Sequence, residues 1–211
     1  MTAMQTTALE GPDTAEVDGT DALVRLRTWF GRQRSVVVAF SGGADSAFVA
    51  WVATEVLGPE RVHCATAVSP SLPDAELHDC AALAAGWGLN WSKVVTDELD
   101  DPAYRRNDAQ RCYHCKDALA RALRPLAEAE GATVVLGVNL DDLGDHRPGQ
   151  RAAAEHGARF PLVEVGFTKA MVRASSERST SWRRISWRDS RERPSRVLIS
   201  LSILTASSLM T

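Results

Sequence analysis

The amino-acid sequence predicts a doubly wound α/β fold, in which helices cover both faces of a parallel, five-stranded, Rossmann-like sheet. Three observations support this prediction. Short runs of β-branched residues alternate with segments of helical periodicity, a pattern typical of parallel sheets. Polar motifs follow several of these runs, where ligands bind in such folds. The chain has 211 residues, 45% of them hydrophobic, which is enough to bury the core of one domain.

The N-terminal part of the fold is expected to contain a helix, a strand and a second helix. Over residues 21–33 the apolar side chains share one face of a helix that Thr20 or Asp21 caps. The run SVVVAF, at 35–40, is typical of a strand that is buried on both faces. Apolar residues then recur at helical spacing until Gly58 and Pro59 end the second helix.

The remaining elements continue this alternation. We expect further strands where apolar and β-branched residues cluster, at 61–68, 90–95, 132–139 and 158–165. We expect helices between these strands, at 73–88, around 115–130 and from residue 147 onward.

The composition narrows the possible locations of the protein. Residues 1–20 have neither a basic start nor an apolar stretch, so we interpret them as a disordered lead rather than a signal peptide. No apolar run is long enough to span a bilayer, and we expect a cytoplasmic protein without a membrane partner. Its four cysteines are then more often thiols or metal ligands than disulfides.

The charge distribution argues against a nucleic-acid partner. The formal net charge is −3, but the residues from Val172 onward hold eight arginines and three acids. This segment therefore carries +5, and the rest of the chain carries −8. A body this acidic repels a phosphate backbone.

The stretch SGGADS, at 41–46, lies where a strand gives way to a helix. A helix N-terminus offers free backbone N–H groups and a partial positive charge. Gly42 and Gly43 let a ligand approach the backbone, and Ser41 and Ser46 add hydroxyl donors. This pattern predicts an anion site suited to phosphate. The structural alternative is a plain turn in which the acid or the second serine caps the helix.

Two common phosphate motifs do not fit this stretch. No lysine follows the glycines as the Walker A motif requires, and the third glycine of the dinucleotide fingerprint is missing. SGGADS instead resembles the signature of the PP-loop ATP pyrophosphatases, which are adenine nucleotide alpha-hydrolase-like proteins. The resemblance implies that the glycines and serines hold the β- and γ-phosphates of ATP. It also makes Asp45 a candidate ligand of Mg²⁺.

Three further stretches make the resemblance more specific: NDAQRCYHCK (107–116), GVNLDDLGDHRPG (137–149) and PLVEVGFTKAMVR (161–173). With SGGADS they resemble the LarE-type ATP-dependent sacrificial sulfur transferases of nickel-pincer cofactor biosynthesis. The resemblance implies adenylation of a carboxylate on a small pyridinium mononucleotide, release of pyrophosphate and replacement of an oxygen by sulfur. In that family the sulfur comes from an enzyme cysteine, which becomes dehydroalanine, or from a sulfide on an iron–sulfur cluster.

The resemblance also implies roles for residues beyond the glycine turn. The implied catalytic residues are Asp45, Arg111, Lys116 and Arg147. The implied nucleotide contacts, besides SGGADS, are Ala39, Ala67, Gly137 and Asn139, with Gly137 leaving room for adenine or ribose. The implied Mg²⁺ ligands are Asp45, Asp142 and Asp145. For these last acids, a solvated loop in which Asp145 caps the next helix is the alternative.

Cys112 and Cys115 form a C-x-x-C pair among basic residues, where a helix is expected to begin. A helix N-terminus and positive charge both lower a thiol pKa, so we expect thiolates. The pair has two interpretations: a sulfur or iron–sulfur cluster site, or a motif whose basic neighbours contact phosphate. Cys64 and Cys80 have structural settings, which leaves no four-cysteine metal set.

The resemblance stops after Arg173. We interpret residues 21–173 as an ATP-binding α/β domain and 174–211 as an atypical, poorly ordered tail rich in serine and arginine. A shifted reading frame and a genuine basic segment are the two explanations of this tail. Because no cysteine follows Cys115, we expect ATP binding and adenylation without completed sulfur transfer.

Other functions remain open at this point. An amidating ligase of the NAD or GMP synthase type shares SGGADS but leaves RCYHCK unexplained. A tRNA thiolase has a use for the C-x-x-C pair, although the acidic body disfavours it. A non-catalytic ATP-binding protein needs only the glycine turn. A homo-oligomer is also left open.

Overall fold

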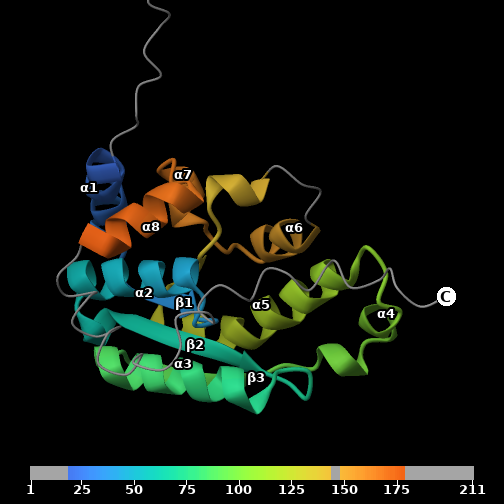
Figure 1. Ribbon diagram of the computed structural model, residues 1–211. Helices are drawn as coiled ribbons and strands as arrows, with labels where there is room; N and C mark the ends of the chain where they lie inside the picture. Colours follow the sequence, from blue (N-terminus) through green and yellow to red (C-terminus); the bar gives the residue numbers. More distant parts are fainter. Residues whose placement is uncertain (1–18, 144–147, 179–211) are drawn as a thin grey trace, which may run out of the picture.

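The computed structural model describes residues 19–143 and 148–178, and these form a three-layered α/β structure (Figure 1). The central sheet consists of four parallel strands in the order β3-β2-β1-β4. The strands are β1 (Val36–Ala39), β2 (Val62–Val68), β3 (Trp91–Val95) and β4 (Thr133–Leu136). The order reverses between β1 and β4. Ligands of doubly wound folds bind at such a switch point, beyond the carboxyl ends of the strands.

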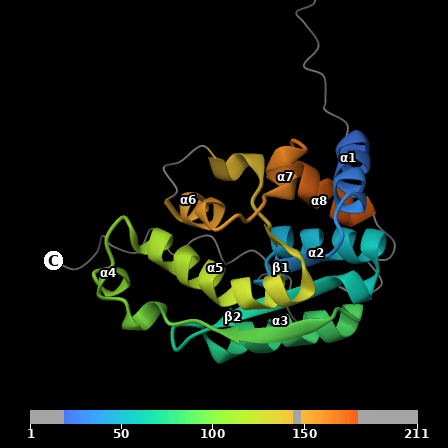
Figure 2. The same cartoon turned by 180° about the vertical axis from the view of Figure 1, so that it is seen from behind.

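One face of the sheet is covered by α2 (Ala44–Leu57) and α3 (Asp74–Trp87), and α1 (Gly19–Gly31) packs against α2. Their apolar residues pack with Val36 and Val38 of β1 and with Cys64 of β2 in one buried cluster. The side chains of a strand alternate between faces, so Val37 and Ala65 point to the opposite side. There they pack against α5 (Arg111–Glu130), which crosses the back of the sheet in Figure 2. Burial on both faces explains the unbroken apolar run of β1.

The C-terminal part of the described chain folds back beside α1. It contains α6 (Pro148–Glu155), α7 (Pro161–Glu164) and α8 (Lys169–Arg178), and α7 and α8 lie together with α1 in both views. The guanidinium of Arg25 donates to the carbonyl oxygen of Val165 at 3.2 Å, and the ring of Phe167 packs 5.5 Å from that of Phe48. Short helical turns complete the fold: η1 (Pro59–Arg61), η2 (Glu98–Asp100), α4 (Pro102–Arg105) and η3 (Leu140–Leu143).

The predicted fifth strand is wrong for the described part of the chain. Residues 158–165 contribute only an isolated parallel bridge, between Arg159 and Val135. Pro161 then occupies the first helical position and starts α7. Proline has no N–H to donate to a strand neighbour and a φ already suited to a helix, so it ends the pairing there. The other predicted strands and helices are confirmed, with shifts of a few residues at their ends.

Two expectations about the chain ends stay predictions. Residues 1–18 and 179–211, which hold most of the predicted lead and tail, lie outside the described residues. Helix α8 runs past Arg173 to Arg178, and Ser175 and Ser176 are buried. Among the described residues, no helix is long and apolar enough to cross a membrane.

Candidate nucleotide-binding site

The glycine turn joins β1 to α2 and is held together by its own serines. Ser46 Oγ donates to the carbonyl oxygen of Gly43 at 3.0 Å and lies 3.1 Å from Ser41 Oγ. Gly43 is the N-cap residue of α2, and no side chain caps this helix. The capping alternative for SGGADS is therefore wrong, and the first turn of α2 presents backbone N–H groups at the carboxyl edge of the sheet.

The left-handed backbone of the turn is at Gly42, whose φ is +72°, whereas Gly43 has φ −70°. Only Gly42 therefore requires the conformational freedom of glycine. A Cβ atom on Gly42 would lie 2.9 Å from Cys80 Sγ of α3. The thiol of Cys80 therefore lies directly against the glycine turn.

Asp45 and Asp142 lie together although 97 positions separate them in the sequence. Asn139, which is fully buried, donates through Nδ2 to Asp45 Oδ2 at 3.1 Å. Its backbone N–H donates to Asp142 Oδ2 at 3.3 Å. Each of the two aspartates is only 8% exposed. Asn139 therefore joins the loop after β4 to the first turn of α2.

The electrostatics of this pair fit a bound cation. Burial raises the pKa of Asp45, and the charge of Asp142 raises it further. Oδ1 of Asp45 is buried and has no hydrogen-bond partner among the described residues. Mg²⁺ is commonly held by one or two carboxylates together with substrate phosphates, so the pair suits this ion. No group of three or more metal-binding side chains occurs in the described ranges, and the predicted third ligand, Asp145, lies outside them.

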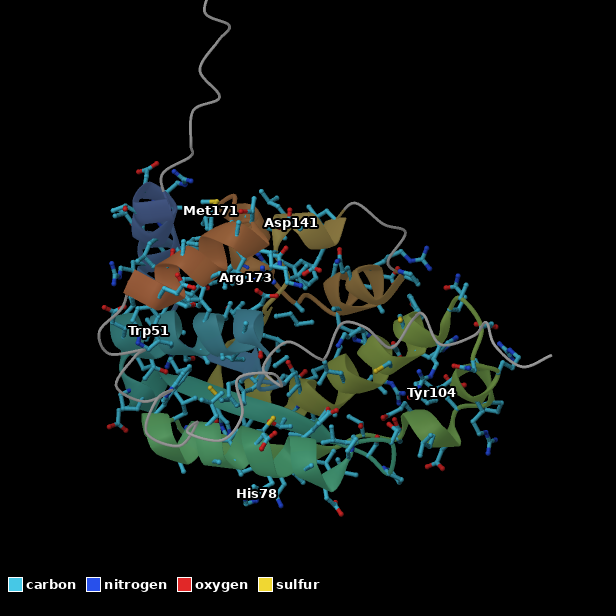
Figure 3. The ribbon with its side chains drawn as sticks, viewed as in Figure 1. Trp51, His78, Tyr104, Asp141, Met171 and Arg173 are labelled. Atoms are coloured by element: carbon cyan, nitrogen blue, oxygen red, sulfur yellow. The ribbon has the colours of Figure 1, made fainter. Side chains whose placement is uncertain are left out.

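Two cations of α8 complete the surroundings of Asp45, and sequence reasoning missed both of them. The charges of Lys169 and Arg173 act on Asp45 and oppose the rise of its pKa. They are four residues apart and share one face of α8. The backbone N–H of Lys169 donates to Asp141 Oδ2 at 2.6 Å, and Asp141 and Arg173 lie in the same part of the molecule in Figure 3. Positive charge beside a phosphate turn is suited to a triphosphate.

Gly137 lies against the first turn of α2. A Cβ atom there would lie 2.6 Å from Ser46 N and 2.7 Å from the carbonyl carbon of Asp45. The space on the Cβ side is therefore filled by the backbone of α2, and the approach of adenine or ribose to the strand at Gly137 stays a prediction. The glycine lets the end of β4 approach α2. Ala39 and Ala67 are partly buried on the face that α5 covers, and their contact with nucleotide stays a prediction.

The first turn of α5 carries a second group of predicted residues. A helix between two parallel strands begins near their carboxyl ends, so this turn lies at the same edge of the sheet. Arg111 donates to the hydroxyl of Tyr104 at 2.7 Å and stacks on its ring. Lys116 passes Gly149 of α6, where a Cβ atom would lie 2.9 Å from Lys116 Cγ. In the described part of the chain Lys116 has no ion pair. The predicted Arg147 lies outside the described residues.

The expectation of two thiolates is wrong for Cys115. Burial raises its pKa, and the positive charges of Lys116 and Arg111 only partly oppose this. The negative charge of Glu98 raises it further. Cys112, three residues earlier, is exposed. The sequence identified the basic neighbours correctly but contained no sign that α5 would bury one of the two sulfurs.

Comparisons with known proteins agree with this arrangement. The family model described as NAD synthase matches residues 28–120. An uncharacterised protein of Synechocystis sp. is 47% identical over 156 residues, covering 74% of this chain and 58% of that protein. The pyridinium-3,5-bisthiocarboxylic acid mononucleotide synthase of Lactiplantibacillus plantarum is 36% identical over 143 residues, covering 67% of this chain and 52% of the synthase. The chain thus spans about half the length of these curated relatives.

Solved structures with the same fold include two NAD synthetases. The glutamine-dependent enzyme of Acinetobacter baumannii, in complex with ADP, has a TM-score of 0.61 at 17% identity. The match covers 82% of this chain and 34% of the chain of that enzyme. The ammonia-dependent enzyme of Campylobacter jejuni has a TM-score of 0.60 at 18% identity. The match covers 76% of this chain and 72% of the chain of that enzyme. At these identities the likeness shows the fold alone. The resemblance to the sulfur transferases, predicted from four motifs, is confirmed by the relative from L. plantarum.

Proposed function

We propose that this chain, a relative of the LarE-type sulfur transferases on a fold shared with NAD synthetases, is the ATP-dependent adenylating part of such an enzyme. The acceptor would be a carboxylate of a pyridinium mononucleotide. The observation that carries the proposal is the convergence of the phosphate turn, the Asp45–Asn139–Asp142 group and two cations at one edge of the sheet. The 36% identity to a synthase whose name specifies a pyridinium mononucleotide supports the acceptor class.

The residues would divide the work of adenylation between them. The turn from Ser41 to Ser46 would hold the β- and γ-phosphates through backbone N–H groups and hydroxyls. Lys169 and Arg173 would neutralise the charge that builds up on the departing pyrophosphate. Asp45 and Asp142 would hold Mg²⁺, which when bound offsets the negative charge of the phosphates. An oxygen of the acceptor carboxylate would attack the α-phosphorus, and the P–O bond to pyrophosphate would break.

The adenylated carboxylate can then react with sulfur. Carboxylate oxygen is a poor leaving group, whereas AMP departs readily once sulfur has added to the carbonyl carbon. The C-x-x-C pair at the start of α5 is one candidate for handling sulfur, directly or through an iron–sulfur cluster. The other interpretation leaves Arg111 and Lys116 as contacts of the acceptor phosphate. The raised pKa of Cys115 favours the second interpretation for the protein without metal, because metal binding requires the thiolate.

The test is incubation of the chain with ATP, Mg²⁺ and a pyridinium dicarboxylate mononucleotide, with and without sulfide. We expect pyrophosphate and AMP that depend on the acceptor, and an oxygen-to-sulfur mass change in the acceptor when sulfide is present. An amidated product formed with ammonia would instead favour an amidating ligase, the candidate that the NAD synthase match supports. Binding of ATP without any pyrophosphate release, with every acceptor, would contradict both enzymatic functions.

A further inference from the structure

A second polar cluster lies near the amino ends of the strands, on the side of the sheet away from the candidate nucleotide site. Its members are His63, the second residue of β2, Ser92, the second residue of β3, and Glu130, the last residue of α5. His63 and Ser92 stand near the amino ends of their strands, whereas the nucleotide site is at the carboxyl ends. The cluster shares no residue with that site.

The three side chains form a continuous hydrogen-bonded chain. Ser92 Oγ lies 2.8 Å from Nε2 of His63, and Nδ1 of His63 lies 2.7 Å from Glu130 Oε1. The imidazole is mostly buried, with 13% of the side chain exposed. The carboxylate is on Nδ1 and the hydroxyl on Nε2. A serine nucleophile, its base and the orienting acid are connected in this same order in serine hydrolases.

This geometry prepares His63 to accept a proton. An ionised Glu130 can only accept a hydrogen bond, so it favours the tautomer with the hydrogen on Nδ1. Nε2 then carries the free electron pair toward the hydroxyl of Ser92. A histidine that merely connects α5 to the sheet would make similar contacts. The two roles differ in one property, which is the reactivity of Ser92.

The position of β3 gives this serine an open side. β3 is an edge strand of the described four-stranded sheet, so the N–H groups on its outer side have no strand partner. Ser92 is itself partly exposed. A small ligand can therefore approach Ser92 from the free edge of the sheet.

We propose that Ser92, His63 and Glu130 form a second reactive site, which accepts the acyl group of small activated esters. Ser92 Oγ bonds to the ester carbonyl carbon while its proton moves to Nε2 of His63. As the C–O bond to the leaving alcohol breaks, the proton passes to that alcohol. The acyl group stays on Ser92 until water, activated by His63 in the same way, releases it as a carboxylic acid.

The experiment uses the full chain and a fluorophosphonate probe, which phosphonylates an activated serine with loss of fluoride. Peptide mass spectrometry locates the label, and release of nitrophenol from p-nitrophenyl acetate gives a second readout. We expect labelling at Ser92, none at that position in Ser92→Ala, and a rate lower on the order of a hundredfold in His63→Gln. Ser35→Ala is the matched control, because Ser35 also contacts Glu130, through its backbone oxygen, but has no histidine beside it.

The outcomes separate a reactive site from a structural contact. Absence of label at Ser92 in the unmodified chain overturns the proposal, and so does an equal labelling rate in folded His63→Gln. If that variant does not fold, judged by circular dichroism, Glu130→Gln decides the question. This variant keeps the serine–histidine contact but no longer holds the hydrogen on Nδ1, so we expect labelling slower by on the order of a hundredfold or more. Equal rates in Glu130→Gln and the unmodified chain would overturn the proposal as well.

Discussion

Asn139 donates a hydrogen bond to Asp45 across 3.1 Å, and this contact connects the end of β4 to the first turn of α2. The same asparagine receives the backbone N–H of Asp141 on Oδ1 at 2.9 Å. A buried amide with partners on both of its ends holds one orientation. Asn139 therefore fixes the position of the carboxylate that we assign to Mg²⁺.

The first prediction concerns the role of that carboxylate. Asp45→Asn should lower the rate of ATP-dependent pyrophosphate release by about a hundredfold or more, because a neutral amide is a poor ligand for a hard cation. The measurement is pyrophosphate release at saturating ATP. Asp100→Asn, at an exposed residue of η2, is the control and should behave like the unmodified chain. Near-normal turnover in Asp45→Asn would contradict the assignment.

The same substitution should stabilise the protein without nucleotide. The pKa of Asp45 is raised above its ordinary 3.8, so the fold favours the protonated acid. This favourable contribution is complete below pH 3.8 and is lost as the pH rises through the raised value. At pH 7 the buried negative charge therefore destabilises the fold. We expect Asp45→Asn to gain about 1 kcal/mol at pH 7, or roughly 2–4 °C in Tm, and the gain to shrink toward pH 4.

The second prediction concerns the close approach of β4 and α2. Gly137→Ala would place a Cβ atom 2.6 Å from Ser46 N, and backbone cannot move aside as a flexible side chain does. We expect a loss of about 2–3 kcal/mol in the free energy of unfolding and weaker binding of ATP. Gly31→Ala is the matched control, since its Cβ atom would meet only Val56 Cγ1 at 4.0 Å. Urea unfolding of both variants checks the difference, and equal stabilities would contradict it.

The sequence predicted those parts of the fold that depend on local patterns. Four of the five predicted runs form strands, and SGGADS lies between β1 and α2, where a phosphate-binding turn is expected. The predicted fifth strand failed because one residue, Pro161, ended the pairing after a single bridge. Its proline was visible in the sequence, but a proline at the start of a strand is also tolerated on an edge.

The candidate site was predicted less completely than the fold. Asp45, Asn139 and Asp142 each follow a strand, so their convergence could be inferred from the topology. Lys169 and Arg173 lie on a helix that follows no strand, and their distance from Asp45 depends on how α8 packs on α1 and α2. Two signals were available: both residues lie in PLVEVGFTKAMVR, one of the stretches that carry the family resemblance, and they are four positions apart. Nothing in the sequence indicated that the backbone of α2 would lie against Gly137.

The third prediction tests these two cations. Lys169→Ala and Arg173→Ala should each weaken ATP binding about tenfold, the equivalent of about 1.4 kcal/mol, because each removes a positive charge beside the phosphate turn. Binding of AMP should change less, since AMP lacks the β- and γ-phosphates. Lys93→Ala, on the edge strand β3, is the lysine control. Calorimetric titration with ATP and AMP gives both affinities, and an equal loss for the two nucleotides would contradict a role at pyrophosphate.

The fourth prediction concerns the order in which the thiols react. Alkylation requires the thiolate, so a raised pKa slows it at neutral pH. Cys112, which is exposed, should react with iodoacetamide first, and Cys115 should follow more slowly. Cys64, whose pKa burial raises to about 12, and Cys80 should react only after unfolding. Peptide mass spectrometry over time at pH 7.5 measures the order, and faster alkylation of Cys115 than of Cys112 would be inconsistent with the burial of its sulfur.

The last prediction examines the contact beneath the phosphate turn. Gly42→Ala introduces two separate costs. A φ of +72° disfavours alanine by about 1–2 kcal/mol, and the new Cβ atom meets Cys80 Sγ at 2.9 Å, which adds about 1–3 kcal/mol of overpacking. Cys80→Ala removes the sulfur and hence only the second cost. The double variant should therefore be more stable than the sum of the single losses implies, by about 1 kcal/mol. Cys64→Ala is the control partner, because Cys64 is also a buried thiol but does not contact Gly42. Its loss of stability should add to that of Gly42→Ala within about 0.5 kcal/mol.

Urea unfolding of the five variants and the unmodified chain measures both double-mutant cycles. If the stability losses of Gly42→Ala and Cys80→Ala also add, the Cys80 thiol does not contact the glycine turn closely enough to affect its stability. A positive coupling without recovery of ATP affinity would show that the left-handed backbone of Gly42, rather than its packing, is what the phosphates need.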